Sequence, residues 1–356
     1  MTVPSSSRRP APRRRTVLAS LLAAGTIALA ACQGGTPADP SSPSPSSSPS
    51  PSVSDVETEA LTLLLDWAPN PDHAALYTAQ HIGAYDEQRI ATEFRTPANT
   101  ADAAREVSLG RADLAISYEP DTLIARSQGL DVVSVAALIP TALTSVISWS
   151  DAPIASGKDM EGKTVGISGL ASQLPTLDYI AREAGIDPAS ITTPNLQQSL
   201  GQAILSKQAD AVFGAFRNIE GVELAEQGDF TIVPVTEFGV PDYAELVIIA
   251  NPTRLAEDAG YADRVKRFLA ATAQGQEAAV ADPAKAVAAL EPVTKGSYDP
   301  VMLEKMVGAT LALLPTEGFG TQSSDDWAAY AAWMYDNGLL ETEVDGAAAT
   351  TNDLLP

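Results

Sequence analysis

Short apolar runs alternate with amphipathic stretches from about residue 58 to the end of the chain, and this alternation restricts the fold more than any other feature. A buried strand is a short apolar run, whereas an amphipathic stretch of helical period is a helix that packs on one face. The pattern therefore predicts an α/β architecture with parallel strands. Strands are predicted at 61–65, 114–116, 132–139, 146–149 and 246–250, and helices at 73–82, 101–109, 121–128, 261–280, 283–290, 300–314 and 323–337.

The length of this part and an internal echo predict two lobes. About 300 residues exceed what one hydrophobic core usually holds. Residues 109–116 and 205–212 each read as a helix end, a polar turn, Ala-Asp and a short apolar strand. The strands at 146–149 and 246–250 would cross between the lobes, with a ligand in the crevice at the strand ends. The predicted division is 58–148 for the first part of lobe I, 149–247 for lobe II and 248–356 for the rest of lobe I with the C-terminal helices.

The start of the chain has the layout of an export signal. Five arginines precede an uninterrupted small and apolar run from Val17 to Ala31, which is too short to span a bilayer. The run ends in Leu29-Ala30-Ala31-Cys32, which resembles the bacterial lipobox and implies a signal peptide over 1–31 and a diacylated Cys32. Arginine occurs in both Sec and twin-arginine signals, so the export route stays open. A chance cysteine near a signal peptide is the alternative.

Composition restricts the class of partner. Residues 32–57 are mostly Ser, Pro, Gly, Thr and Ala, which predicts a disordered spacer after the lipidated cysteine. The formal charge is −23 for the whole chain, and it becomes −28 without the signal, which holds five arginines and no acid. Nucleic acid is therefore excluded as a partner. The charge also argues mildly against an anionic ligand, although a local basic pocket could overcome it.

Catalytic and metal-binding motifs are not detected. The chain has one cysteine, and its two histidines, His73 and His81, lie two helical turns apart, too far to share a metal. It carries neither a phosphate-binding Gly-Lys-Ser/Thr loop nor a Gly-x-Ser-x-Gly elbow. We therefore expect no metal, no cofactor and no enzymatic activity.

Several segments point to one family. They are Asp-Trp-Ala-Pro-Asn-Pro-Asp-His at 66–73, the strand and its Tyr-Glu-Pro extension at 112–120, Lys-Thr-Val-Gly at 163–166, Ala-Phe-Arg-Asn-Ile-Glu at 215–220 and Phe-Gly-Val-Pro-Asp-Tyr-Ala-Glu-Leu at 238–246. Together they resemble the substrate-binding proteins of ABC importers for thiamine pyrimidine precursors, which share a fold with fungal thiamine-pyrimidine synthases. The resemblance implies a type II periplasmic-binding-protein fold, a two-lobed Venus flytrap, with a ligand between the lobes and an importer permease as partner.

The chain departs from the family pattern in two places. Arg89 stands where the family usually has a glycine that eases a left-handed turn, which concerns loop geometry rather than the cleft. Fungal synthases carry a cysteine-rich motif, whereas this chain has no cysteine after Cys32. The second departure disfavours the enzymatic relatives.

A substituted aminopyrimidine needs aromatic surfaces for its faces. Trp67 follows the first strand and is the candidate for stacking, and Tyr118 and Tyr243 stand at matching strand ends. Core packing is the alternative role for all three.

The polar edge of such a ring needs acceptors and donors. The candidates are Asn70, Asn218 and Glu220, with Glu119 and Glu245 as weaker ones. Glu220 could instead be an exposed helix acid. His73 could line the cleft or cap its helix, and Asp66 is expected to cap the turn that follows it.

These observations predict an extracytoplasmic, lipid-anchored solute-binding protein on the cell membrane that captures a thiamine-related aminopyrimidine for an ABC importer. A binding protein for a sulfonate, nitrate or another small ligand is the alternative within the same class. A pyrimidine-synthesis enzyme is the alternative from another class.

The lipid anchor can be tested by a single substitution. We expect Cys32→Ser to move the protein from the membrane fraction to the soluble fraction, because it removes the thiol that would carry the acyl chains. Cell fractionation and immunoblotting measure the distribution, with Ser41→Ala in the spacer as the control. A Cys32→Ser protein that stays in the membrane fraction with unchanged processing would refute the anchor.

Overall fold

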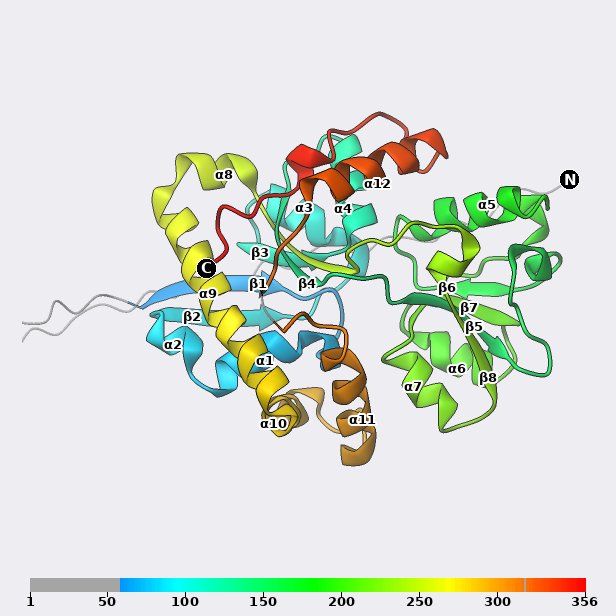
Figure 1. The fold of residues 1–356 in the computed structure, drawn as a ribbon, viewed down its shortest axis with the longest axis horizontal. Coiled ribbons are helices and arrows are strands. Elements are labelled where there is room, and N and C mark those ends of the chain that lie inside the picture. The colour runs from blue at the N-terminus through cyan, green and yellow to red at the C-terminus, as the bar shows by residue number, and fades with distance from the viewer. Residues whose placement is uncertain (1–57, 317) are drawn as a thin grey trace, which may run out of the picture. The chain divides into compact units, whose positions relative to one another are not determined.

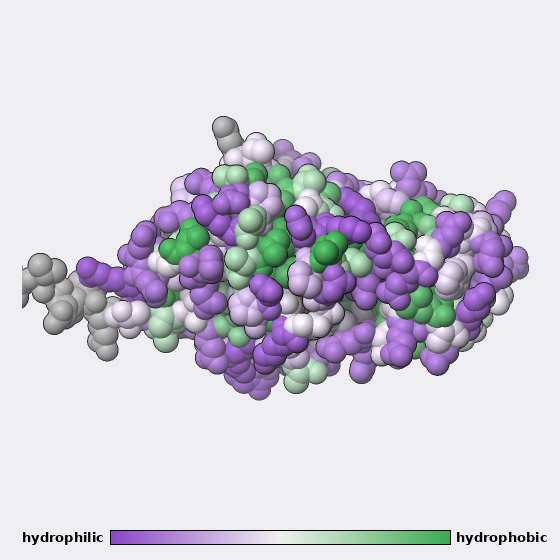
Figure 2. Space-filling view, turned by 90° about the horizontal axis from the view of Figure 1, so that it is seen from below, coloured by the Kyte–Doolittle hydropathy of each residue, from purple (hydrophilic) through white to green (hydrophobic). Residues whose placement is uncertain are grey.

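The computed structural model describes residues 58–316 and 318–356, which contain two β-sheets flanked by helices (Figure 1). The predicted signal peptide over 1–31, the lipidated Cys32 and the spacer over 32–57 lie outside the described residues. No helix in the described part is long and apolar enough to cross a membrane. Figure 2 shows hydrophilic side chains over most of one face, with apolar side chains in small separate patches.

The larger sheet has the strand order β2-β1-β3-β9-β4. β1 pairs in parallel with β2 and β3, whereas β9 runs antiparallel to both β3 and β4. One apolar core lies between this sheet and α1, α2, α9, α10 and α11, and a second core lies on its other face under α3, α4 and α12. The strands are β1 (Glu59–Leu64), β2 (Ile90–Arg95), β3 (Leu114–Ser117), β4 (Val133–Ile139) and β9 (Leu246–Ala250).

The helices around the larger sheet agree closely with the sequence pattern. The predicted helix at 73–82 is a 3₁₀ turn, η1 (Pro71–His73), followed by α1 (Ala74–His81), with Asn70 as the N-cap residue. The remaining helices of this part are α2 (Ala84–Glu87), α3 (Ala103–Ser108), α4 (Glu119–Ser127), α8 (Pro252–Glu257), α9 (Ala259–Ala281), α10 (Pro283–Thr294), α11 (Pro300–Leu311) and α12 (Ser324–Asp336).

The smaller sheet has the order β6-β7-β5-β8. β5 lies antiparallel between β7 and β8, and β6 pairs in parallel with β7. The strands are β5 (Thr144–Trp149), β6 (Val165–Ile167), β7 (Ala211–Phe216) and β8 (Phe230–Pro234), and the helices are α5 (Gln173–Glu183), α6 (Leu200–Leu205) and α7 (Glu220–Ala225).

The predicted parallel strands make up only part of each sheet, because both sheets are mixed. β4 leaves the larger sheet and continues as β5 after residues 140–143, and the chain returns through η6 (Val235–Phe238) into β9. A returning strand enters its sheet from the opposite end, so β9 must oppose β3 and β4. The predicted lobe boundaries at 148/149 and 247/248 fall within β5 and β9, and each of these strands belongs wholly to one sheet.

Arg89 does adopt the strained conformation that its position in the family pattern implies. Its φ is +56°, in the left-handed region, where the chain turns from α2 into β2. An L-residue is disfavoured there relative to glycine. The turn lies away from the end of β1 that leads into the cleft, so it concerns local geometry.

Two carboxylates, the buried Glu245 and the exposed Asp242, tie the crossing segments together. Glu245 Oε2 accepts hydrogen bonds from the backbone N–H groups of Leu143 (2.7 Å) and Thr144 (2.8 Å), and Asp242 accepts one from Ala142 (2.8 Å). Burial raises the pKa of Glu245 to about 7, although the same N–H groups oppose the shift. The two crossings therefore form one cross-linked hinge.

Removal of the Glu245 carboxylate should destabilise this hinge. We expect Glu245→Ala to lower the free energy of unfolding by about 2–4 kcal/mol, because two buried N–H groups lose their acceptor. Glu245→Gln keeps an acceptor oxygen and should lose clearly less. Urea denaturation measures both variants, and equal stabilities for the alanine and glutamine variants would contradict this role.

Candidate functional site

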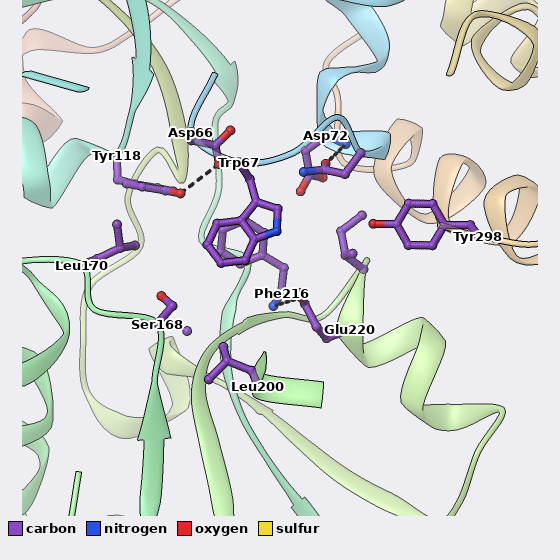
Figure 3. Close-up of a pocket in the computed structure, with 13 residues that line it drawn as sticks. Asp66, Trp67, Asp72, Tyr118, Ser168, Leu170, Leu200, Phe216, Glu220 and Tyr298 are labelled. Atoms are coloured by element: carbon purple, nitrogen blue, oxygen red, sulfur yellow. Dashed lines mark hydrogen bonds between the residues drawn. The ribbon is translucent and has the colours of Figure 1, made fainter. Parts of the chain in front are cut away.

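A cavity that opens to solvent lies between the two sheets (Figure 3). Strand ends position most of its walls: Trp67 follows β1, Tyr118 follows β3, Ser168 follows β6 and Phe216 ends β7. The carboxyl ends of strands in open α/β sheets are the usual place for a ligand. The lining consists of Asp66, Trp67, Asn70, Asp72, Tyr118 and Tyr298 on one side and Ser168, Leu170, Leu200, Gly214, Phe216, Ile219 and Glu220 on the other.

Aromatic and aliphatic side chains give the cavity flat apolar surfaces. Trp67 is partly exposed, and in Figure 3 its indole lies in the middle of the labelled side chains. The rings of Tyr118 and Phe216 meet edge to face at 6.4 Å, one from each lobe. Leu170 and Leu200 add aliphatic contact. Such walls favour a planar ligand whose faces stack on aromatic rings.

Asp66 is a buried carboxylate that contacts two hydrogen-bonding side chains, His73 and Tyr118. Its Oδ2 accepts a hydrogen bond from the Tyr118 hydroxyl (2.8 Å), and its Oδ1 lies 2.8 Å from His73 Nε2. The backbone N–H of Asn70 donates to His73 Nδ1 (3.3 Å), so Nδ1 accepts and the ring proton must be on Nε2. Burial opposes ionisation, but the bonds from His73 and Tyr118 outweigh it and hold the pKa of Asp66 below its ordinary value.

This arrangement corrects the capping role expected for Asp66. Asn70 is the cap: its Oδ1 accepts from the backbone N–H of Asp72 (2.8 Å), and its Nδ2 donates to the carbonyl of Ala68 (3.2 Å). The side chain of Asn70 therefore shapes the turn that carries the cavity wall, and Asp66 is free to face the cavity.

Three carboxyl groups line the cavity, and none of the lining residues is lysine, arginine or histidine. Asp72 and Glu220 join Asp66, and burial raises the pKa of both. Glu220 begins α7 and lines the cavity, and its Oε2 accepts a hydrogen bond from the backbone N–H of Phe216 (2.8 Å). A site of this composition favours ligands rich in N–H donors over anions.

The structure brings together four of the seven predicted ligand-binding residues. Trp67, Asn70, Tyr118 and Glu220 line the cavity. His73 is fully buried behind Asp66, and Asn218 is buried behind Asp72. His73 and Asn218 do not line the cavity themselves but hold the carboxyl groups of Asp66 and Asp72 that do.

Tyr243 lies outside this cavity. It packs beside the hinge, 5.3 Å from the ring of Tyr330, in a neighbouring smaller pocket. The reason is the direction of β9, which begins at the cleft instead of ending there, so the residues before it belong to the crossing. Glu119 and Glu245 lie at the same crossing, where Glu119 accepts a hydrogen bond from the backbone N–H of Ala244 (2.8 Å).

Sequence reasoning did not select several lining residues. Phe216 and Asp72 lie within the family segments at 215–220 and 66–73, so their place in these segments was the signal that could have identified them as lining residues. Leu170, Leu200 and Tyr298 stand in segments without a motif, and only the folded chain brings them to the cavity. Within the described residues, no group of three or more His, Cys, Asp or Glu side chains could hold a metal ion.

Comparison with known proteins identifies the family. A family model described as NMT1/THI5 like matches residues 70–286. The formylaminopyrimidine-binding protein of Halalkalibacterium halodurans is 30% identical over 322 residues, which cover 89% of this chain and 92% of that protein. This chain belongs to the NMT1/THI5-like family.

Members of this family have different activities. The 4-amino-5-hydroxymethyl-2-methylpyrimidine phosphate synthase of Legionella pneumophila is 31% identical over 219 residues, which cover 60% of this chain and 67% of the synthase. Family membership by itself therefore does not choose between binding and catalysis.

A solved structure defines the fold. The alkanesulfonate-binding protein SsuA from Xanthomonas axonopodis pv. citri, bound to MOPS, aligns with a TM-score of 0.65 at 18% identity over 83% of this chain and 99% of that one. The predicted periplasmic-binding-protein fold is confirmed.

The two histidines provide a matched test of the buried pair. We expect His73→Ala to lower the free energy of unfolding by about 2–4 kcal/mol at neutral pH, because it leaves the Asp66 carboxylate buried without one of its two donors. The lowered pKa of Asp66 contributes stability above its ordinary value of 3.8, and this contribution is lost as the pH falls through the lower folded value. The deficit of the variant should therefore shrink in acid.

Thermal and urea unfolding between pH 3 and pH 8 measure this difference. His81→Ala serves as the control, since His81 is exposed at the end of α1. A His73→Ala deficit that is the same at all pH values would show that packing alone accounts for it.

Proposed function

We propose that this protein is the solute-binding component of an ABC importer and that it captures a thiamine-related aminopyrimidine outside the cytoplasm. The observation that carries the proposal is the cavity itself, which combines aromatic walls with three carboxyl groups and no basic side chain. The formylaminopyrimidine-binding relative, which aligns over most of both chains, supports the same ligand class.

An aminopyrimidine fits the chemistry of this cavity. Its ring is flat and can stack on Trp67 or Phe216, which line the space from opposite lobes. Its exocyclic amine donates hydrogen bonds, and carboxylate oxygens accept them with charge assistance. Glu220 is the natural acceptor, because only its Oε2 is engaged by the protein.

A sulfonate or nitrate fits the same cavity poorly. The sulfonate-binding structure is 18% identical to this chain. Similarity at this level supports a shared fold but does not support a shared ligand. An anion would face the permanent charge of Asp66 without any lysine or arginine among the lining residues. The acidic composition of the whole chain acts in the same direction.

We further propose a transport role and not a catalytic one. The sequence lacks the cysteine-rich motif of the fungal synthases, and its single cysteine is Cys32, far from the cavity residues in the chain. The export signal over 1–31 and the lipobox would place the protein on the outer face of the cell membrane, tethered by Cys32, where an importer permease receives the loaded form.

Calorimetry decides the ligand class. We expect heat and a thermal shift with formylaminopyrimidine or 4-amino-5-hydroxymethyl-2-methylpyrimidine and none with taurine or nitrate. Trp67→Ala should weaken the pyrimidine complex by about 5- to 150-fold, the equivalent of about 1–3 kcal/mol of lost apolar contact. Glu220→Gln should weaken an amine-bearing ring more than an analogue without the amine.

Tyr335→Ala is the control for this series, because Tyr335 is an aromatic residue that is 44% exposed on α12 and outside the cavity. Binding of taurine or nitrate without any response to the pyrimidines would overturn the ligand class and leave the fold unchanged. Pyrimidine binding that is unaffected by Trp67→Ala would show that the ring stacks elsewhere.

A further inference from the structure

Asp72 occupies a junction between the two lobes and the cavity. It belongs to η1, is 4% exposed and lines the cavity. Its Oδ1 accepts a hydrogen bond from Nδ2 of Asn218 (2.5 Å), which follows β7 in the other lobe, and another from the Thr310 hydroxyl of α11 (3.3 Å). Asn218 Nδ2 also donates to Thr310 (2.7 Å), so the three side chains form a closed group.

The second carboxyl oxygen of Asp72, Oδ2, takes no part in these hydrogen bonds. Oδ2 is buried and has no hydrogen-bond partner among the described residues. Buried polar atoms are almost always satisfied, so an orphan on a cavity wall indicates a partner supplied from the cavity. Figure 3 shows the carboxyl group of Asp72 directed to the same space as Trp67 and Glu220.

The position of the proton follows from the same contacts. Burial raises the pKa of Asp72 well above its ordinary value, the charges of Asp66 and Glu220 act in the same direction, and the bonds from Asn218 and Thr310 oppose the rise. Oδ1 already accepts two hydrogens, so a proton on this carboxyl group would be placed on Oδ2. The protonated form of Asp72 therefore presents a donor on the wall of the cavity that Glu220 also lines.

We propose that Asp72 is a specificity-determining residue of this cleft, whose Oδ2 hydroxyl donates a hydrogen bond to an unprotonated ring nitrogen while Oδ1 holds Asn218 of the opposite lobe. This inference rests on the proposed function, since it takes the ligand to be an aminopyrimidine. The amino group of the ring is a hydrogen-bond donor, and the neighbouring ring nitrogen is an acceptor. The Glu220 carboxylate would accept from the amino group, and the Asp72 carboxylic acid would donate to the ring nitrogen.

The pairing predicts which pyrimidines are rejected. A 4-oxo ring reverses the pattern, because it presents a carbonyl acceptor beside a ring N–H donor. The carbonyl would face Glu220 and the N–H would face the Asp72 hydroxyl, so like groups would meet and remain unpaired. The cleft should therefore prefer 4-aminopyrimidines to their 4-oxo counterparts.

Asp72 also links recognition to the contact between the lobes. Its Oδ1 accepts a hydrogen bond from Asn218 of the other lobe, so this bond requires the two lobes to be close together. The same carboxyl group supplies the donor to the ligand. A ligand that bonds Oδ2 fixes the orientation in which Oδ1 reaches Asn218. Ligand binding and lobe closure are then coupled through one side chain.

Calorimetry on wild type, Asp72→Asn and Asp72→Ala tests the assignment. The probes are 4-amino-5-hydroxymethyl-2-methylpyrimidine and its 4-oxo counterpart. We expect Asp72→Ala to bind the amino probe about 10- to 100-fold more weakly, and Asp72→Asn to recover most of that loss, because an amide keeps an acceptor for Asn218 and places an N–H where the hydroxyl was. Wild type should bind the 4-oxo probe at least 10-fold more weakly than the amino probe.

A pH series keeps the test decisive if Asp72→Ala does not fold. Wild-type affinity should fall as the pH rises through the pKa of Asp72, because the donor is lost, whereas the Asp72→Asn variant should not show this component. Titration of the ligand is common to both proteins and cancels in their ratio. Asp66, Glu220 and Tyr298, which face Asp72, and the neighbouring His73 are present in both proteins. A constant ratio, or equal loss in the alanine and asparagine variants, would overturn the assignment while pyrimidine binding stands. Absence of binding by wild type would overturn the proposed function together with this inference.

Discussion

The double crossing of the chain between the two sheets is the constraint on which the rest of the structure depends. β4 passes directly into β5, and η6 returns the chain into β9, which inserts between β3 and β4. These passages place the ends of β1, β3 and β7 around one cavity. They also bring backbone N–H groups into the interior, and Glu245 and Asp242 satisfy them. The buried carboxylate of Glu245 in the hinge is thus a consequence of the topology.

The acidic character of the cavity depends on where each carboxyl group finds its donors. Asp66 has two donors within its own lobe, and their hydrogen bonds hold its pKa below the ordinary value, whereas Asp72 has donors on one oxygen only and burial raises its pKa. Groups of the same chemistry that lie close together thereby acquire opposite hydrogen-bonding roles. A cavity that contains both an acceptor and a donor can read the edge of a ring by hydrogen bonding, which apolar walls cannot do.

Contacts between the lobes extend beyond the cavity. At its rim, the Ser172 hydroxyl at the start of α5 donates to Asp121 of α4 (2.7 Å). Farther out, Trp333 of α12 meets the ring of Tyr179 of α5 at 4.9 Å. Of the aromatic residues of α12, Trp327 is buried, Trp333 reaches the second lobe and Tyr335 is exposed.

The sequence by itself determined the kinds of element, the two-lobed class and the segment that begins the site. Buried strands and amphipathic helices follow from local apolar periodicity, and Asp66 to His73 form a local turn whose cap is specified by Asn70. Trp67, Tyr118 and Glu220 were accessible to sequence reasoning because each stands beside the end of a recognisable strand. Strand direction was not accessible, because a buried run is equally apolar whether it leaves a sheet or returns to it. Only the tertiary structure placed Tyr243 at the hinge and Tyr298 at the cavity. It alone joined Asp72 to Asn218, which lie 146 positions apart in the chain. The pKa of a buried acid depends on such partners, and local sequence cannot specify them.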